Sequence, residues 1–342
     1  MSAKVSSSIA ARLLAWYDAN ARRLPWRSPP GSPAPDPYRV WLSEVMLQQT
    51  TVAAVRPRFE AWVARWPTLE AFAAASDADV MAAWAGLGYY ARARNLLKCA
   101  RAVVADHGGR FPDSEAALRT LPGLGDYTAA AVAAIAFGRR AVVVDANVKR
   151  VVARLFADDG GDVRALADSI TPDARAGDFA QAMMDLGSAI CTPRAPKSLL
   201  CPLRAYCAGL ATGNPEAFPP KKAKAEKPTR YGTIFWLERG DDVLLVRRPD
   251  TGLLGGMRAL PTGPWTSEPP DLAEAPAQAD WQWRPAELTH VFTHFRLICR
   301  LAAARVEAQE AGAAGEWWPV ARLADAGLPT LFARAADMIR RD

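Results

Sequence analysis

The sequence lacks the features that mark membrane and secreted proteins. No apolar run approaches the roughly 20 residues that a membrane-spanning helix needs, and the N-terminus has no continuous apolar signal segment. Five cysteines, three of them between residues 191 and 207, do not form a dispersed disulfide framework. We therefore expect a cytoplasmic protein, and the abundance of Ala and Arg favours a bacterial source.

The excess of charge of one sign is also small. Lys and Arg number 42 against 36 Asp and Glu, which gives a formal net charge of +6. This excess suits a polyanionic partner without requiring one. Half of the 342 residues are hydrophobic, so the chain can bury a sizeable core, and its length suggests two domains.

The hydrophobic pattern divides the chain into three parts. Residues 1–210 have apolar positions spaced at three and four, which predicts an all-α domain. Residues 211–229 are rich in Pro, Lys and small side chains and predict a solvated linker. Residues 230–342 predict an α+β domain, in which residues 232–249 alternate like a β-hairpin, residues 290–306 predict one further strand and the last residues return to helical spacing.

The segment LPGLGDYTAAAVAAIAFG places a Gly-x-Gly turn, Gly123 and Gly125, between two helical stretches. Glycines let the backbone turn sharply and approach a phosphate closely, and the N-terminus of the next helix offers unpaired N–H donors. Such a helix-hairpin-helix positions DNA without reading its bases. An ordinary glycine-capped turn would have the same local pattern.

Two carboxylates stand in patterns that suit catalysis. Asp145 follows a run of valines in VVVDANVKRV and precedes Asn147, although an Asp there can also serve only as a helix N-cap. Glu44 is followed by the apolar run Val45–Leu47, which favours burial, although it can also be a solvated helix charge.

Together these segments resemble one protein family. LPGLGDYTAAAVA followed by VDANVKR is similar to the helix-hairpin-helix DNA glycosylase superfamily, and VWLSEVMLQQTTVAAV, GLGYYARARNL and QAMMDLGSAICTPRAPK resemble adenine glycosylases of the MutY type. The resemblance implies an all-α, endonuclease III-like catalytic domain. It also implies that Glu44 is the catalytic acid, because adenine leaves readily only after a ring nitrogen is protonated. Asp145 would stabilise the positive charge that develops on the sugar.

The resemblance also assigns roles to two neighbours of these carboxylates. Tyr127 stands where bifunctional relatives carry a nucleophilic Lys. Because tyrosine cannot form a Schiff base, we expect base removal by water, with Tyr127 and Asn147 positioning groups around Asp145.

The target adenine must leave the duplex before excision, and side chains must fill the gap. By resemblance, Gln49 and Tyr89 wedge into the stack beside the oxidised guanine, and Leu87 and Thr50 support them. Those that hold the edge of the flipped adenine are Arg27 and Gln181. Tyr89 and Leu87 can instead be ordinary core residues, which periodicity does not exclude.

The family's iron–sulfur motif, C-x6-C-x2-C-x5-C, is complete here except for one ligand. Cys191, Cys201 and Cys207 match three positions, and Ser198 takes the second. A serine oxygen is harder than a thiolate and ligates iron less readily. A 4Fe-4S cluster with Ser198 or another group at one iron, a 3Fe-4S cluster, and a loop without a cluster are the alternatives. We expect a retained 4Fe-4S cluster with a structural role.

Residues 244–263 resemble the Nudix-like C-terminal domain of MutY-type enzymes. A Nudix hydrolase needs clustered Glu residues that hold magnesium, and none follow the Gly-Gly pair of this segment, so we expect a fold reused for binding. Phe292, Thr293 and His294 stand where the family's Phe-Ser-His triplet meets the damaged base. Thr keeps the hydroxyl group and adds a methyl group. Without the resemblance, His294 fits a solvent-facing strand position equally well.

The sequence therefore predicts a monofunctional DNA glycosylase of base excision repair that hydrolyses the N-glycosidic bond of adenine mispaired with 8-oxoguanine or guanine. Its expected partner is double-stranded DNA that contains this mispair. We expect the protein to be cytoplasmic and associated with the bacterial nucleoid, and to be a monomer. A glycosylase of broader mismatch scope and a DNA-binding scaffold without turnover are the alternatives. A scaffold would need neither Glu44 nor Asp145.

Overall fold

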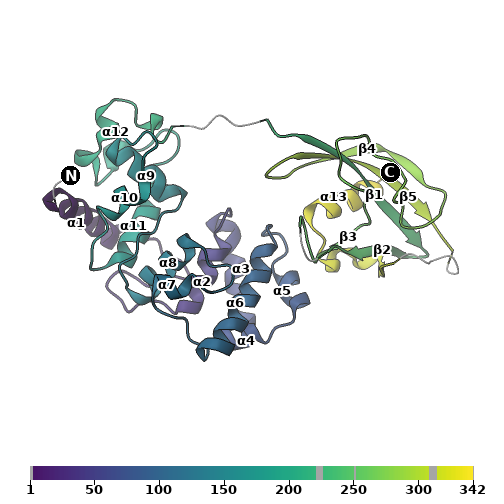
Figure 1. Ribbon diagram of the computed structural model, residues 1–342, viewed down its shortest axis with the longest axis horizontal. Coiled ribbons are helices and arrows are strands. Elements are labelled where there is room, and N and C mark those ends of the chain that lie inside the picture. The colour runs from purple at the N-terminus through teal and green to yellow at the C-terminus, as the bar shows by residue number, and fades with distance from the viewer. Residues whose placement is uncertain (1–2, 221–225, 250–251, 308–313, 342) are drawn as a thin grey trace. The chain divides into compact units, whose positions relative to one another are not determined.

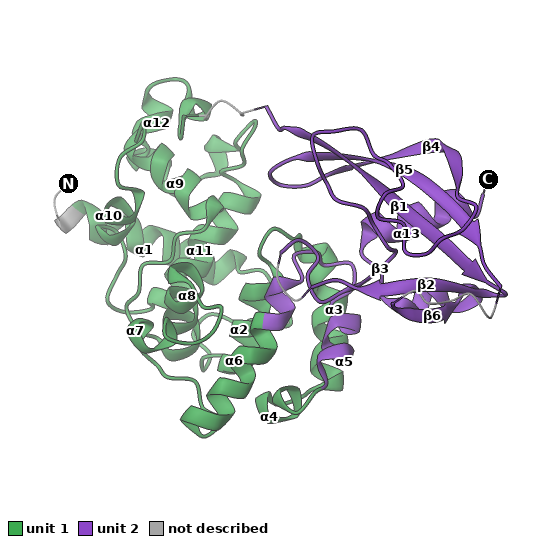
Figure 2. Ribbon diagram, turned by 45° about the vertical axis from the view of Figure 1, so that its right-hand side comes forward, with its two compact units in different colours: residues 1–75, 95–223 green, residues 76–94, 224–342 purple. Residues whose placement is uncertain are grey.

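The computed structural model describes residues 3–220, 226–249, 252–307 and 314–341. The chain divides into two compact units (Figure 2), residues 1–75 with 95–223 and residues 76–94 with 224–342. Residues 221–225, in the expected linker, and residues 250–251, in the Nudix-like segment, lie outside the described residues.

The described residues of the first unit form helices and connecting turns, as the spacing of apolar positions predicts (Figure 1). The longer helices are α1 (Ala3–Asn20), α2 (Pro37–Met46), α3 (Val52–Arg65), α6 (Ala91–His107), α8 (Asp126–Phe137), α9 (Ala146–Phe156) and α11 (Ala176–Ala189). The short ones are α4 (Leu69–Ala73), α7 (Glu115–Leu118), α10 (Val163–Asp168), α12 (Ala208–Ala211) and the 3-10 turns η1 (Ser198–Leu200), η2 (Arg204–Tyr206) and η3 (Pro215–Ala217). None of the described helices is long and apolar enough to cross a membrane.

Helix α8 lies at the centre of this unit, and most of its side chains are small and apolar. Residues 128–136 are all buried. Helix α11 approaches closely through two glycines: a Cβ on Gly177 would lie 2.3 Å from the carbonyl oxygen of Ala134, and one on Gly187 would lie 2.6 Å from the Cβ of Asn147. The glycines therefore let α11 pack against α8 and the first turn of α9.

The second unit is an α+β fold with a mixed sheet. Its elements are α5 (Asp77–Ala83), β1 (Thr229–Arg239), β2 (Asp242–Arg247), β3 (Arg258–Ala259), β4 (Gln282–Val291), β5 (Arg296–Arg305), β6 (Glu316–Pro319), the 3-10 helix η4 (Val320–Ala326) and α13 (Thr330–Ile339). The strand order is β3-β2-β1-β5-β4, with β6 also paired to β2. Strands β1 and β5 run parallel, and the other pairs are antiparallel.

The predicted hairpin is confirmed as β1 and β2, but the prediction of one strand over residues 290–306 is wrong. This segment holds the end of β4, a turn, and β5. The backbone N–H of Phe292 donates to the carbonyl of Phe295 at 2.9 Å and closes the turn. Both rings pack together, with centroids 4.9 Å apart. The apolar pattern thus continues through the turn, so periodicity did not reveal it.

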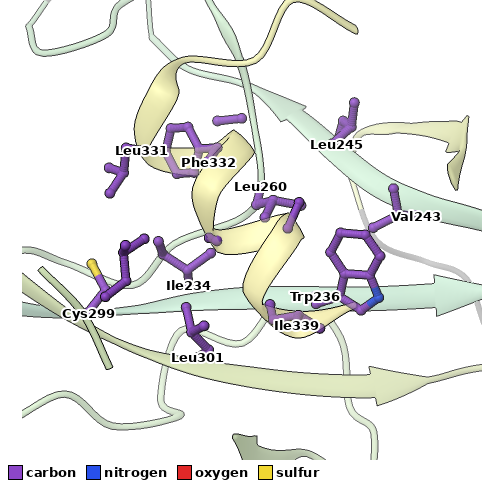
Figure 3. Close-up of a cluster of buried hydrophobic side chains, with 14 of the residues drawn as sticks. Ile234, Trp236, Val243, Leu245, Leu260, Cys299, Leu301, Leu331, Phe332 and Ile339 are labelled. Carbon is purple, nitrogen blue, oxygen red and sulfur yellow. The ribbon is translucent and has the colours of Figure 1, made fainter. Parts of the chain in front are cut away.

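Helix α13 covers one face of this sheet (Figure 3). Its apolar residues Leu331, Phe332 and Ile339 contribute to one buried cluster with Ile234 of β1 and Leu301 of β5. Together with Ala335 and Ala336, these residues recur at spacings of three and four and so lie on a single face of α13. The second unit therefore has its own hydrophobic core.

Candidate active site

The expected acid, Glu44, is buried in the helical unit. It lies on α2 with 7% of its surface exposed, so it is not a solvated helix charge. The Tyr127 hydroxyl, from the first turn of α8, donates to Oε2 of Glu44 at 2.5 Å. Burial raises the pKa of Glu44, and outweighs the opposite effects of the Tyr127 hydrogen bond and the Arg27 charge; the nearby Asp145 charge raises it further. The site therefore favours a protonated Glu44.

Tyr127 acts as a hydrogen-bond donor in this arrangement. Burial and the neighbouring Glu44 raise the pKa of its phenol well above the ordinary value. Tyr127 consequently keeps its proton, and its hydroxyl holds one oxygen of Glu44 in place.

Asp145 is held through both carboxylate oxygens. It is the N-cap of α9, and its Oδ1 accepts the backbone N–H of Val148 at 2.6 Å. Its Oδ2 accepts the side-chain amide of Asn147 at 2.9 Å. The N-cap interpretation is therefore correct, and it does not exclude a catalytic role, because the cap and the Asn147 amide also fix the orientation of the carboxylate.

A chain of hydrogen bonds connects Asp145 to the cysteine loop. Asn147 uses its Oδ1 to accept from Arg150 at 2.9 Å. Arg150 also donates to the carbonyl oxygens of Gly187 and Cys191, each at 2.7 Å. The orientation of Asp145 therefore depends partly on the backbone position of the loop.

Arg27 and Gln181 are both buried in the helical unit, but Arg27 is already paired. Its NH1 donates to Oδ2 of Asp185 at 2.7 Å, and Arg22 donates from Nε to Oδ1 of the same carboxylate at 2.6 Å. Gln181 donates to the carbonyl oxygen of Gly177 at 3.3 Å. Sequence reasoning missed Asp185 and Arg22. The available signal was the spacing of four between Gln181 and Asp185, which places both on one face of α11.

Gln49 and Tyr89 share a rare backbone conformation. Their φ angles are +53° and +48°, and both side chains are exposed, Tyr89 to 51%. Such strained non-glycine residues gather at functional sites. Tyr89 is therefore no core residue, whereas Leu87, with 5% exposure, is one. Thr50 is half-buried and donates to the carbonyl of Gln48 at 3.1 Å.

The two hairpin glycines differ in backbone conformation and in the space around them. Gly123 has a φ of +77°, and an added Cβ would lie 2.6 Å from the Cβ of Asn95, so the fold itself requires glycine there. Gly125 is the N-cap of α8 with an ordinary φ of −86°, and an added Cβ would meet nothing within 4 Å. Gly125 thus leaves open space before a helix N-terminus, where an anion is favoured.

In the second unit, Phe292, Thr293 and His294 form the turn between β4 and β5. Thr293 and His294 are exposed, while the Phe292 ring packs 5.5 Å from that of Trp265. The Thr293 hydroxyl lies 3.2 Å from the Tyr89 hydroxyl. Two residues that the resemblance assigned to the damaged base therefore meet within this unit.

The cysteine loop gathers its expected ligands. Cys191, Cys201, Cys207 and Ser198 line one cavity together with Arg154. Within the described residues, no group of three or more His, Cys, Asp or Glu side chains could hold a metal ion. That finding concerns a single ion, whereas a cluster distributes its thiolates over several irons.

Arg154 gives this cavity an uncompensated positive charge. It is 2% exposed and donates to Sγ of Cys191 at 3.4 Å and to the carbonyl oxygens of Thr192 and Pro193. Among the described residues it forms no ion pair with a carboxylate. A buried cation without an anionic counterion is costly, so the cavity fits an anionic group such as a thiolate-bound cluster.

Comparisons with known proteins define the class. Residues 42–170 match the family described as HhH-GPD superfamily base excision DNA repair protein, and residues 233–338 match the NUDIX domain. A thermostable thymine-DNA glycosylase is 30% identical with a TM-score of 0.54, covering 61% of this chain and 98% of that one. A trapped endonuclease III–DNA intermediate, 22% identical with a TM-score of 0.52 over 62% of this chain and 99% of that one, shows the same fold. The protein is thus a DNA glycosylase of base excision repair joined to a Nudix domain.

Similar curated proteins narrow this class. Human adenine DNA glycosylase is 35% identical over 87% of this chain and 67% of its own length, and the mouse enzyme is 34% identical over 95% and 76%. The Mycobacterium tuberculosis enzyme is 45% identical over 62% and 71%. The chain therefore belongs to the adenine DNA glycosylase family. The predicted family, the endonuclease III-like fold and the Nudix-like second fold are confirmed.

Proposed function

We propose that this glycosylase hydrolyses the N-glycosidic bond of adenine mispaired with 8-oxoguanine, or with guanine, in double-stranded DNA. The observation that carries the proposal is the pairing of two carboxylates in different surroundings. Glu44 is buried and held by the Tyr127 hydroxyl, while Asp145 is kept at a helix N-terminus by two hydrogen bonds. Burial raises the pKa of Glu44, which suits an acid, and the hydrogen bonds hold the Asp145 carboxylate in one orientation, which suits a charge stabiliser.

In this mechanism Glu44 gives its proton to a ring nitrogen of the extruded adenine. The N-glycosidic bond then breaks, its electron pair leaves with adenine, and the anion of Asp145 stabilises the positive sugar. Water adds to the sugar carbon and returns a proton to the Glu44 carboxylate. Because Tyr127 offers no amine, no Schiff base forms and the DNA strand is left uncut.

We assign recognition of the oxidised base to the turn at Phe292, Thr293 and His294, with Tyr89 beside it. The exposed hydroxyls of Thr293 and Tyr89 can each donate or accept a hydrogen bond. 8-Oxoguanine differs from guanine by a hydrogen on N7 and an oxygen on C8. A few hydrogen bonds at this turn therefore suffice to tell the two bases apart.

Single-turnover adenine release from duplexes with one 8-oxoguanine:A, G:A or T:A pair tests this function. We expect the oxidised pair to react fastest and T:A not to react. Thr293→Val keeps the shape of the side chain and removes its hydroxyl, and should reduce the preference for 8-oxoguanine over guanine by about 5- to 150-fold, the equivalent of one hydrogen-bond contact. Thr293→Ser, which retains the hydroxyl, is the matched control. A Thr293→Val enzyme with an unchanged preference would remove this residue from base recognition.

We also propose that loop 191–207 holds an iron–sulfur cluster through Cys191, Cys201 and Cys207, with Ser198 at the fourth position. The shared cavity and the buried charge of Arg154 support this proposal. When bound, the cluster would supply structural order rather than chemistry at the base. It would keep the loop backbone where Arg150 reaches the Cys191 carbonyl.

Iron and acid-labile sulfide in anaerobically purified protein test the cluster directly. We expect both to be present, and Ser198→Cys to slow the loss of iron on exposure to air, because a thiolate binds iron more readily than a serine oxygen. Ser198→Ala should lose iron fastest. Protein without iron in all three forms would refute the cluster, and equal loss from Ser198→Ala and the wild type would show that Ser198 is no ligand.

A further inference from the structure

One buried carboxylate of the helical unit takes no part in the chemistry above. Asp185 is 1% exposed on α11. Its Oδ1 accepts from Arg22 Nε at 2.6 Å, and its Oδ2 accepts from Arg27 NH1 at 2.7 Å and from the Arg22 backbone N–H at 3.3 Å. The Arg27 side chain is 7% exposed and that of Arg22 35%. One anion therefore faces two guanidinium groups, one of them buried.

This arrangement leaves positive charge that Asp185 does not neutralise and that acts on Glu44. A single carboxylate cannot neutralise two cations, and the Arg27 charge acts on Glu44 in the direction that favours its ionised form. The other groups that act on Glu44 are the Tyr127 hydroxyl of α8 and Asp145 at the start of α9. Of these groups, only Arg27 is paired with Asp185.

We propose that Asp185 is a positioning residue for adenine excision, which holds Arg27 in place and limits how much of its positive charge reaches Glu44. This inference rests on the proposed role of Glu44 as the acid. Without Asp185, Arg27 would be a buried cation without its counterion. The Arg27 charge also interacts with the Glu44 carboxyl group. Without Asp185, this interaction would favour loss of the Glu44 proton and so remove the acid.

The pH dependence of single-turnover adenine release measures this effect. Release needs the protonated acid, so its rate falls as the pH rises through the pKa of Glu44. Asp185→Asn exposes Glu44 to more of the Arg27 charge, and should move this decline to lower pH by about one unit. At a fixed pH above the decline, the rate should then fall about tenfold, while the low-pH plateau changes little.

Arg22→Gln should move the same decline in the opposite direction. Without the Arg22 guanidinium group, the Asp185 carboxylate pairs with Arg27 alone and neutralises more of its charge. The fold should also tolerate this variant more easily than Asp185→Asn, because the Arg22 side chain is partly exposed whereas that of Asp185 is buried. Asp178→Asn is the matched control on the same helix, since Asp178 pairs with the half-exposed Arg175.

The outcomes separate the inference from the function on which it rests. Folded Asp185→Asn and Arg22→Gln enzymes whose declines stay at the wild-type pH would overturn the inference, as would an equal loss of rate at every pH. If Asp185→Asn does not fold, an Arg22→Gln enzyme whose rate still declines at the wild-type pH is enough to overturn the inference. If Glu44 is not the acid, the Glu44→Gln enzyme would instead release adenine at the normal rate.

Discussion

Replacing Glu44 with glutamine should slow single-turnover adenine release by about 10²- to 10⁴-fold, the usual contribution of a positioned acid. The amide keeps the size of the side chain and can still accept the Tyr127 hydrogen bond, but it cannot deliver a proton. Binding of the duplex should change little, because Glu44 is buried and carries no charge in its protonated form.

Thermal unfolding distinguishes this chemical loss from a structural one. Burial raises the pKa of Glu44 in the folded protein above that of the unfolded chain. Its ionisation is thus resisted by the fold, so stability falls as the pH rises from the unfolded pKa toward the folded one. Glu44→Gln removes this cost and should be at least as stable as the wild type at neutral pH. Glu60→Gln, an exposed change on α3, is the matched control. Normal release by Glu44→Gln would exclude Glu44 as the acid.

Asp145→Asn should produce the second large loss, about 10²- to 10³-fold in single-turnover release, which is typical for removing an electrostatic stabiliser. Asparagine is as good an N-cap as aspartate. Its side-chain oxygen can still accept the Val148 N–H, so α9 should begin at the same residue. The change therefore removes the charge and the hydrogen bond from the Asn147 amide, while it keeps the cap of α9.

A second substitution at the same position separates capping from catalysis. Asp145→Ala also removes the cap and should lower stability by about 1 kcal/mol, measured by denaturant unfolding, whereas Asp145→Asn should not. Asp162→Asn is the matched control, because Asp162 is an exposed N-cap that accepts from Arg164 and Ala165 at the start of α10. An Asp145→Asn enzyme with full activity would reduce Asp145 to a capping residue.

Both predictions depend on geometry that could be predicted only in part from the sequence. The motif around Glu44 indicated an acid, and burial followed from its apolar neighbours. That Tyr127 donates to Glu44 did not follow, because the two residues are 83 positions apart and meet only where α2 packs against α8. The serine in the cysteine motif was visible at once, but the buried charge of Arg154 beside it was not.

The sequence by itself determined the two fold classes, the family, the hairpin glycines and the two carboxylates. These features are local: periodicity, turns and short motifs depend on residues close together in the chain. Only the tertiary structure decided that Asp185 pairs with Arg22 and Arg27, which lie 163 and 158 positions away. Such pairs form where helices pack against each other, and packing is set by close approaches such as that of Gly187 to Asn147. The spacing of residues along one chain does not encode which distant side chains share a buried site.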